Sequence, residues 1–159
     1  MKRNDILKIA ASLVLLLGAT SMATQIAVAQ EGGNTQPAYN QTASRVTWYT
    51  DLSAAINDAK AQGKLVLIDA GASWCPWCQR MDEVTYADPS VQQFLSQFVC
   101  VRLNTDDGAG AQFAQEHNIN GIPATVVLDP VTGRLADNQG FVQPAQFAAM
   151  VQQLEQQIA

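Results

Sequence analysis

The sequence is poor in the residues that build disulfide scaffolds and metal sites. Its 159 residues include three cysteines and one histidine. A small secreted scaffold held by disulfides has a larger, even number of cysteines. A structural zinc site needs about four ligands, and only Cys100 and His117, on separate predicted elements, are available to join a cysteine pair. Both classes are therefore disfavoured, and we expect neither a metal nor another cofactor.

Basic residues are also scarce, with nine lysines and arginines against 14 acidic residues and a net charge of −5. Three of the nine lie within the first eight positions, so the rest of the chain is more acidic still. Proteins that bind nucleic acid need a basic face. A nucleic-acid partner is therefore excluded.

Long apolar runs are missing except near the N-terminus, where an uncharged stretch covers residues 9–22. Basic residues precede this stretch and small residues surround Ala29. The pattern predicts a secretory signal peptide over residues 1–29, cleaved near Ala29, and a periplasmic or secreted mature chain. The alternative is an uncleaved anchor, but the apolar stretch is short for a membrane span, which takes about 20 residues.

After the leader, residues 30–44 are rich in Gly, Asn, Gln and Thr and predict a flexible lead-in. Residues 45–159 are enough for one domain with a single hydrophobic core, which we expect to be a monomer. Periodicity and turn residues predict alternating strands and helices, an α/β pattern. Strands are expected near 46–49, 64–70, 98–103, 124–128 and from 134, and helices from 52, 76, 89, after 110 and from 144.

The stretch from Ser73 to Gln79 carries the strongest chemical signal. Two cysteines, Cys75 and Cys78, stand three positions apart between a predicted strand and a predicted helix. A helix N-terminus carries a partial positive charge that favours the thiolate of Cys75. Cys78 lies one turn on and can close a disulfide with it, while Pro76 suits the first helical turn.

This pair is interpreted as a reversible dithiol, in which Cys75 attacks a substrate disulfide and Cys78 resolves the mixed disulfide. The alternatives are a permanent structural disulfide and half of a metal site. The strand–turn–helix context favours the redox interpretation.

Further motifs accompany the pair. Asp69 precedes the first cysteine by six residues, Trp74 precedes it directly, and Gly121-Ile122-Pro123 follows downstream. Together with the order of elements over roughly residues 46–157, they resemble the thioredoxin superfamily. The short helix after Asp88 resembles a periplasmic branch related to the C-terminal domain of transmembrane disulfide reductases. The resemblance implies an α/β fold with a single thioredoxin-like domain, a central mixed β-sheet flanked by helices.

The resemblance also implies roles for individual residues. Asp69 interrupts an apolar strand, so burial is expected to raise its pKa. Its counterpart in thioredoxins is thought to exchange a proton with the resolving thiol, here Cys78. The alternative is a strand-end aspartate bound to backbone. Pro123 is expected to follow a cis bond, to face the disulfide and to present the backbone of Ile122 to an extended substrate peptide. The alternative for Pro123 is an ordinary loop breaker.

Two tryptophans flank the cysteine pair. Trp77 is expected to be exposed and to face a partner, whereas Trp74 has either that role or a packing role at the domain edge. Trp77 places no positive charge between the cysteines, so the redox poise stays open. The tryptophan that thioredoxins have four residues before the first cysteine is absent, since Gly71 stands there.

Two further residues have simpler interpretations. Arg102 stands where thioredoxins often have lysine, and either pairs with Asp69 or is solvated. Cys100 lies within a predicted strand and is expected in the core.

These observations predict an exported thiol–disulfide oxidoreductase, most readily a periplasmic disulfide reductase. Protein or small-molecule disulfides are the expected substrates. A membrane thiol reductant is the expected partner, because a reductase in an oxidising compartment must have its cysteine pair reduced again after each reaction. The alternatives are a disulfide oxidase or isomerase, and a non-enzymatic copper-handling dithiol module.

Overall fold

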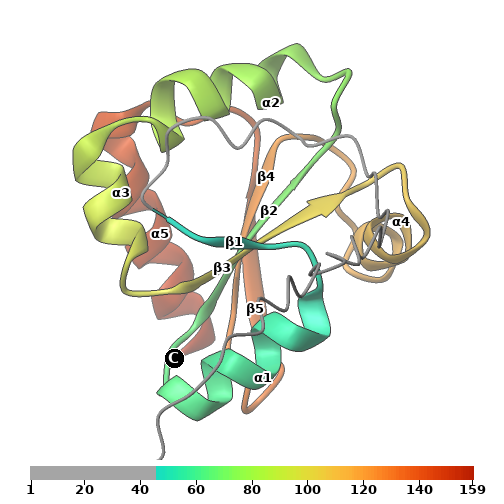
Figure 1. Ribbon diagram of the computed structural model, residues 1–159, viewed down its shortest axis with the longest axis vertical. Coiled ribbons are helices and arrows are strands. Elements are labelled where there is room, and N and C mark those ends of the chain that lie inside the picture. Colours follow the sequence, from blue (N-terminus) through green and yellow to red (C-terminus); the bar gives the residue numbers. More distant parts are fainter. Residues whose placement is uncertain (1–45) are drawn as a thin grey trace, which may run out of the picture. The chain divides into compact units, whose positions relative to one another are not determined.

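The computed structural model describes residues 46–159. The predicted signal peptide (1–29) and lead-in (30–44) lie outside the described residues. The elements in chain order (Figure 1) are β1 (Trp48–Tyr49), α1 (Leu52–Gln62), β2 (Val66–Gly71), α2 (Pro76–Arg80), the π-helix η1 (Met81–Tyr86), α3 (Pro89–Leu95), β3 (Val99–Asn104), α4 (Gly108–Glu116), β4 (Ala124–Leu128), β5 (Leu135–Gln139) and α5 (Pro144–Ile158).

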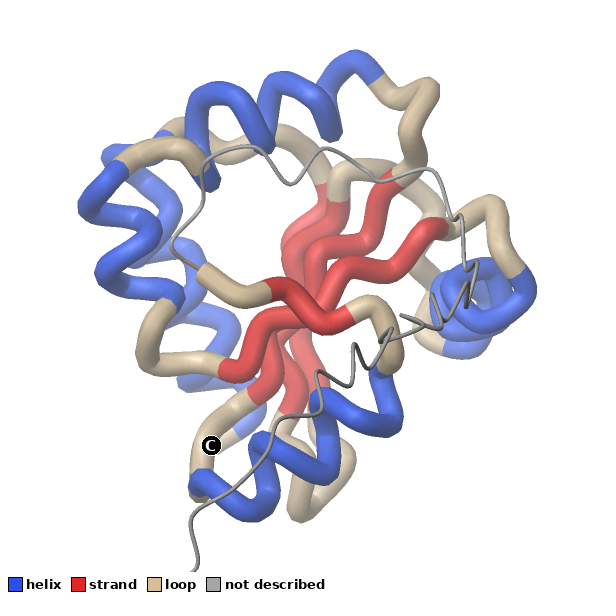
Figure 2. The backbone as a smooth tube through the Cα atoms, in the orientation of Figure 1, coloured by secondary structure: helices blue, strands red, loops and turns tan. Residues whose placement is uncertain are grey.

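The strands form one mixed sheet in the order β1-β3-β2-β4-β5, seen in red in Figure 2. The pairs β1–β3 and β3–β2 are parallel, whereas β2–β4 and β4–β5 are antiparallel. The single thioredoxin-like domain with a mixed sheet and flanking helices is therefore confirmed. Strand β2 lies in the centre, and all six of its residues are buried, as the apolar run predicts.

Helices cover both faces of the sheet. Side chains from α1 and α4 pack on one face, where Val66 and Ile68 of β2 point. Side chains from η1, α3 and α5 pack on the other face, together with Leu67. Because side chains alternate along a strand, Asp69 points to the same face as Leu67, beneath η1. The layering places this acid under the helix that follows the cysteine pair.

Local sequence signals explain several helix ends. Asp51 accepts a hydrogen bond from the amide of Ala54 and caps α1, and Gly63 ends the helix with a φ of 64°. Helix α4 begins earlier than predicted, at Gly108 rather than after residue 110, because Asp107 caps it. Between residues 46 and 159, no helix combines the length and apolar character needed to cross a membrane.

Candidate active site

The cysteine pair lies where the chain leaves β2 and enters α2. Cys75 is the N-cap residue of α2, and Pro76 occupies the first helical turn, as predicted. Cys75 and Cys78 form a disulfide, with their Cα atoms 5.3 Å apart. The predicted bond between them is confirmed.

The two sulfurs have different surroundings. The backbone amide of Cys78 donates to Sγ of Cys75 at 3.1 Å, so a thiolate on Cys75 has a ready hydrogen-bond donor. Cys78 is 0% exposed, whereas Cys75 retains 3% exposure. Charge stabilisation and access therefore both favour Cys75 as the attacking sulfur.

Trp74 and Trp77 directly precede the two cysteines in the chain, and Ile122 packs against the cysteines. We call these three residues the disulfide rim. Trp74 and Trp77 are 65% and 58% exposed, which confirms the exposure predicted for Trp77. The Ile122–Pro123 bond is cis, as predicted.

Two contacts anchor the tryptophans of the rim. The indole N–H of Trp74 donates to Oδ2 of Asp106 at 2.6 Å, so Trp74 is both exposed and tied to the loop after β3. Trp77 packs on Phe141, with ring centroids 5.7 Å apart. Local sequence patterns indicate neither contact, because each joins segments far apart in the chain.

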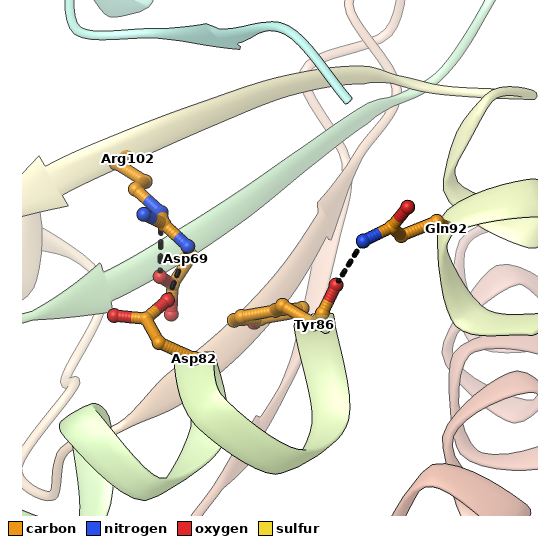
Figure 3. A network of polar contacts seen from close by, with 5 residues as sticks. All are labelled: Asp69, Asp82, Tyr86, Gln92 and Arg102. Atoms are coloured by element: carbon orange, nitrogen blue, oxygen red, sulfur yellow. Dashed lines mark hydrogen bonds and ion pairs between the residues drawn. The ribbon is translucent and has the colours of Figure 1, made fainter. Parts of the chain in front are cut away.

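Asp69 belongs to a charged network with Arg102 of β3 and Asp82 of η1 (Figure 3). It lies opposite Arg102 in the register of β2 and β3, and Arg102 Nε is 3.4 Å from its Oδ2. Arg102 also pairs with Asp82 of η1. Of the two alternatives for Arg102, the structure therefore shows pairing.

Aromatic rings complete the surroundings of Arg102. Its guanidinium lies 4.4 Å from the ring centre of Trp48 and 5.7 Å from that of Tyr86, within cation–π range.

Asp82 and Tyr86 both come from η1, where the sequence indicates an ordinary helix. A π-helical turn is uncommon and occurs often at functional sites, and here it supplies two members of the network. Gln92 of α3 donates to the backbone oxygen of Tyr86 at 3.2 Å, tying the end of η1 to α3.

Burial dominates the proton affinity of Asp69. Burial raises the pKa of this carboxyl to about 7, against the lowering effect of the Arg102 charge, while the charge of Asp82 raises the pKa further. The predicted direction of the pKa shift is confirmed. A carboxyl with this pKa is partly protonated at neutral pH.

Cys100, the third cysteine, takes no part in this site. It is 1% exposed on β3, and burial raises the pKa of its thiol to about 12. The predicted core role is confirmed.

Replacement of Arg102 with methionine is expected to destabilise the domain strongly at alkaline pH. The change removes the cation that Asp69 and Asp82 share, and an uncompensated buried charge costs about 3–5 kcal/mol. At pH 5 the cost is smaller, because Asp69 is then protonated in the parent protein. Urea denaturation at pH 5 and pH 8 measures both values, with Arg134→Met, which changes an exposed arginine directly before β5, as the control. Equal losses at the two pH values would mean that Arg102 contributes only packing.

Comparison with known proteins places this site in context. The family model described as thioredoxin-like matches residues 47–130. The thiol:disulfide interchange protein DsbD of Colwellia psychrerythraea is 29% identical over 147 residues, which cover 89% of this chain and 24% of that protein. The chain thus spans about a quarter of the length of this curated relative.

Solved structures agree on the fold. A thioredoxin from Thermus thermophilus superposes with a TM-score of 0.59 at 27% identity, covering 68% of this chain and 85% of that one. The C-terminal domain of Neisseria meningitidis DsbD, in its oxidised form, gives 0.58 at 23% identity, covering 68% and 99%. At that identity the second likeness bears on the fold alone.

Proposed function

Because the chain belongs to the thioredoxin-like family, we propose that it is an exported thiol–disulfide oxidoreductase that works as a disulfide reductase. The observation that carries the proposal is the Cys75–Cys78 disulfide at the N-cap of α2, with a backbone amide directed at the Cys75 sulfur. The similarity to a thiol:disulfide interchange protein supports the same chemistry.

The proposed reaction begins from the reduced pair. The Cys75 thiolate attacks one sulfur of a substrate disulfide, forms a mixed disulfide and releases the other substrate sulfur as a thiolate. Cys78 then attacks the Cys75 sulfur, which releases the second substrate thiol and restores the Cys75–Cys78 disulfide. Two electrons pass from the protein to the substrate in each cycle.

In this scheme Asp69 accepts the proton of the Cys78 thiol as that sulfur attacks. The support is its burial below η1 and a pKa of about 7, close to the operating pH. Arg102 acts through Asp69 as a positioning residue.

The disulfide rim is proposed to receive the substrate. Two exposed tryptophans suit a partner peptide, and Pro76 between them holds the turn. The Ile122–Pro123 segment, which packs beside the cysteines, is proposed to offer backbone groups to an extended chain. Protein disulfides are therefore the proposed substrates, although small disulfides are also open to attack by Cys75.

The predicted signal peptide supports a periplasmic or secreted location. A reductase in an oxidising compartment needs a continuous supply of electrons, and we propose a membrane thiol reductant as the source. A monomer is sufficient for this cycle, since both cysteines and Asp69 come from one chain.

Turnover assays in both directions test the proposal. With dithiothreitol as the electron source, the protein is expected to accelerate reduction of the insulin disulfides well beyond dithiothreitol alone. The oxidised protein is expected to oxidise a reduced dithiol peptide slowly. Slow reduction together with rapid peptide oxidation would assign the protein as an oxidase instead.

A further inference from the structure

Three consecutive residues, beginning with the last residue of β5, contact the residues that flank Ile122 and the ring of Trp77, two separate parts of the site. They are Gln139, Gly140 and Phe141, and we call them the β5 brace. Gln139 and Gly140 hold the segment that leads into the cis bond at Pro123, whereas Phe141 contacts Trp77 of α2. None of these residues belongs to the cysteine motif.

Gln139 makes an unusual number of contacts for an exposed side chain. Its Oε1 accepts from the backbone amides of Asn120 and Gly121 at 3.0 and 2.8 Å. Its Nε2 donates to the backbone oxygen of Asn118 at 3.3 Å and to Oδ2 of Asp137 at 3.0 Å. One amide group therefore holds three residues of the segment 118–121 in place.

The next two residues extend the brace across the rim. The amide of Gly140 donates to the oxygen of Pro123 at 2.7 Å. Gly140 has a φ of 118°, a conformation that side chains with a Cβ rarely adopt, and this turns the chain between its two neighbours. Phe141 then packs on Trp77 at 5.7 Å.

From this arrangement we propose that the β5 brace sets the position of Ile122 relative to Trp77 and thereby determines how well the protein acts on protein disulfides. The inference rests on the proposed function and adds specificity-determining residues to it. A peptide that lies across the rim must contact both parts at once, so their spacing matters. A small disulfide needs only the Cys75 sulfur, so the spacing matters little.

Two single variants test the brace. Gln139→Ala removes four hydrogen bonds, and Phe141→Ala removes the aromatic contact with Trp77. Each is expected to lower kcat/KM for insulin by about 3–10-fold, mainly through KM, from contacts of this strength. Rates with a small aromatic disulfide are expected to stay within about 2-fold of the parent, because proximity to Cys75 is unchanged. The matched control is Gln62→Ala, which removes a hydrogen bond to Asp58 on α1.

A second measurement needs no activity. In amide NMR spectra of the oxidised protein, Gln139→Ala is expected to shift signals of residues 118–123 and also of Cys75, Cys78 and the Trp77 indole. Gln62→Ala is expected to shift none of these. If the parent protein reduces no disulfide at all, the proposed function is refuted. The NMR result alone then decides whether the β5 brace positions the disulfide rim. The brace is overturned if the shifts stop at residue 123, or if the variants lose insulin and small-disulfide activity equally.

Discussion

Cys75→Ser is expected to abolish disulfide reduction, whereas Cys78→Ser is expected to accumulate mixed disulfides with substrates. Cys75 alone combines residual exposure with an amide donor at its sulfur, so no other group replaces it as the nucleophile. Cys78 is buried beside it and is needed only for the second step. The first variant removes the reaction and the second stops it halfway.

Insulin turnover and non-reducing electrophoresis measure these two outcomes. Cys100→Ala is the matched control, because it removes the remaining thiol, which lies in the core of β3, and it is expected to retain full turnover. Iodoacetamide applied to the reduced protein at neutral pH should label Cys75 first. Preferential labelling of Cys78 would reverse the assigned roles.

Asp69→Asn is expected to stabilise the domain at pH 8 and to leave it nearly unchanged at pH 4. The folded-state pKa of about 7 lies above the ordinary value of 3.8, so the folded protein binds the proton more tightly than the unfolded chain. Stability therefore falls as pH rises from about 4 to about 7 and is level above that range. A shift of this size corresponds to a cost on the order of 4 kcal/mol at pH 8, which asparagine removes.

Urea denaturation between pH 4 and pH 8 checks this expectation, with Glu116→Gln as a control that removes an exposed carboxylate. The slope of stability against pH should be flatter in Asp69→Asn than in the parent protein. If both proteins show the same slope, Asp69 does not carry the raised pKa. The same variant is expected to resolve mixed disulfides about 100-fold more slowly, because the proton acceptor for Cys78 is gone.

Much of this architecture follows from local patterns. The apolar run before Cys75 predicts the buried strand β2, and Asp51, Asp88 and Gly63 mark helix ends through capping that acts within a few residues. Cys75 at the start of α2 follows from the same logic. These features depend on neighbours in sequence, so the sequence reveals them.

The features that escaped prediction depend on distant neighbours. Asp82 pairs with Arg102 from η1, which is a π-helix, and no spacing rule in the sequence indicates that wider turn. In the sequence, nothing distinguishes Gln139 from other polar residues. The pairing of β5 with β4 places it beside Asn120 in the fold. The sequence leaves Arg102 either paired with Asp69 or solvated. The register of β2 and β3, which places Arg102 opposite Asp69, accounts for the pairing.

Whether Cys75 and Cys78 form a reducing pair is tested most directly by their reduction potential. The Cys75 thiolate has the Cys78 amide as a hydrogen-bond donor, but Trp77 brings no positive charge between the cysteines, so this thiolate is stabilised less than one with a cation beside it. A less stabilised thiolate makes the dithiol a better reductant. Equilibration with glutathione is expected to give a value closer to about −270 mV, as in thioredoxin, than to about −120 mV, as in strong oxidants. A value near −120 mV would contradict the assignment as a reductase.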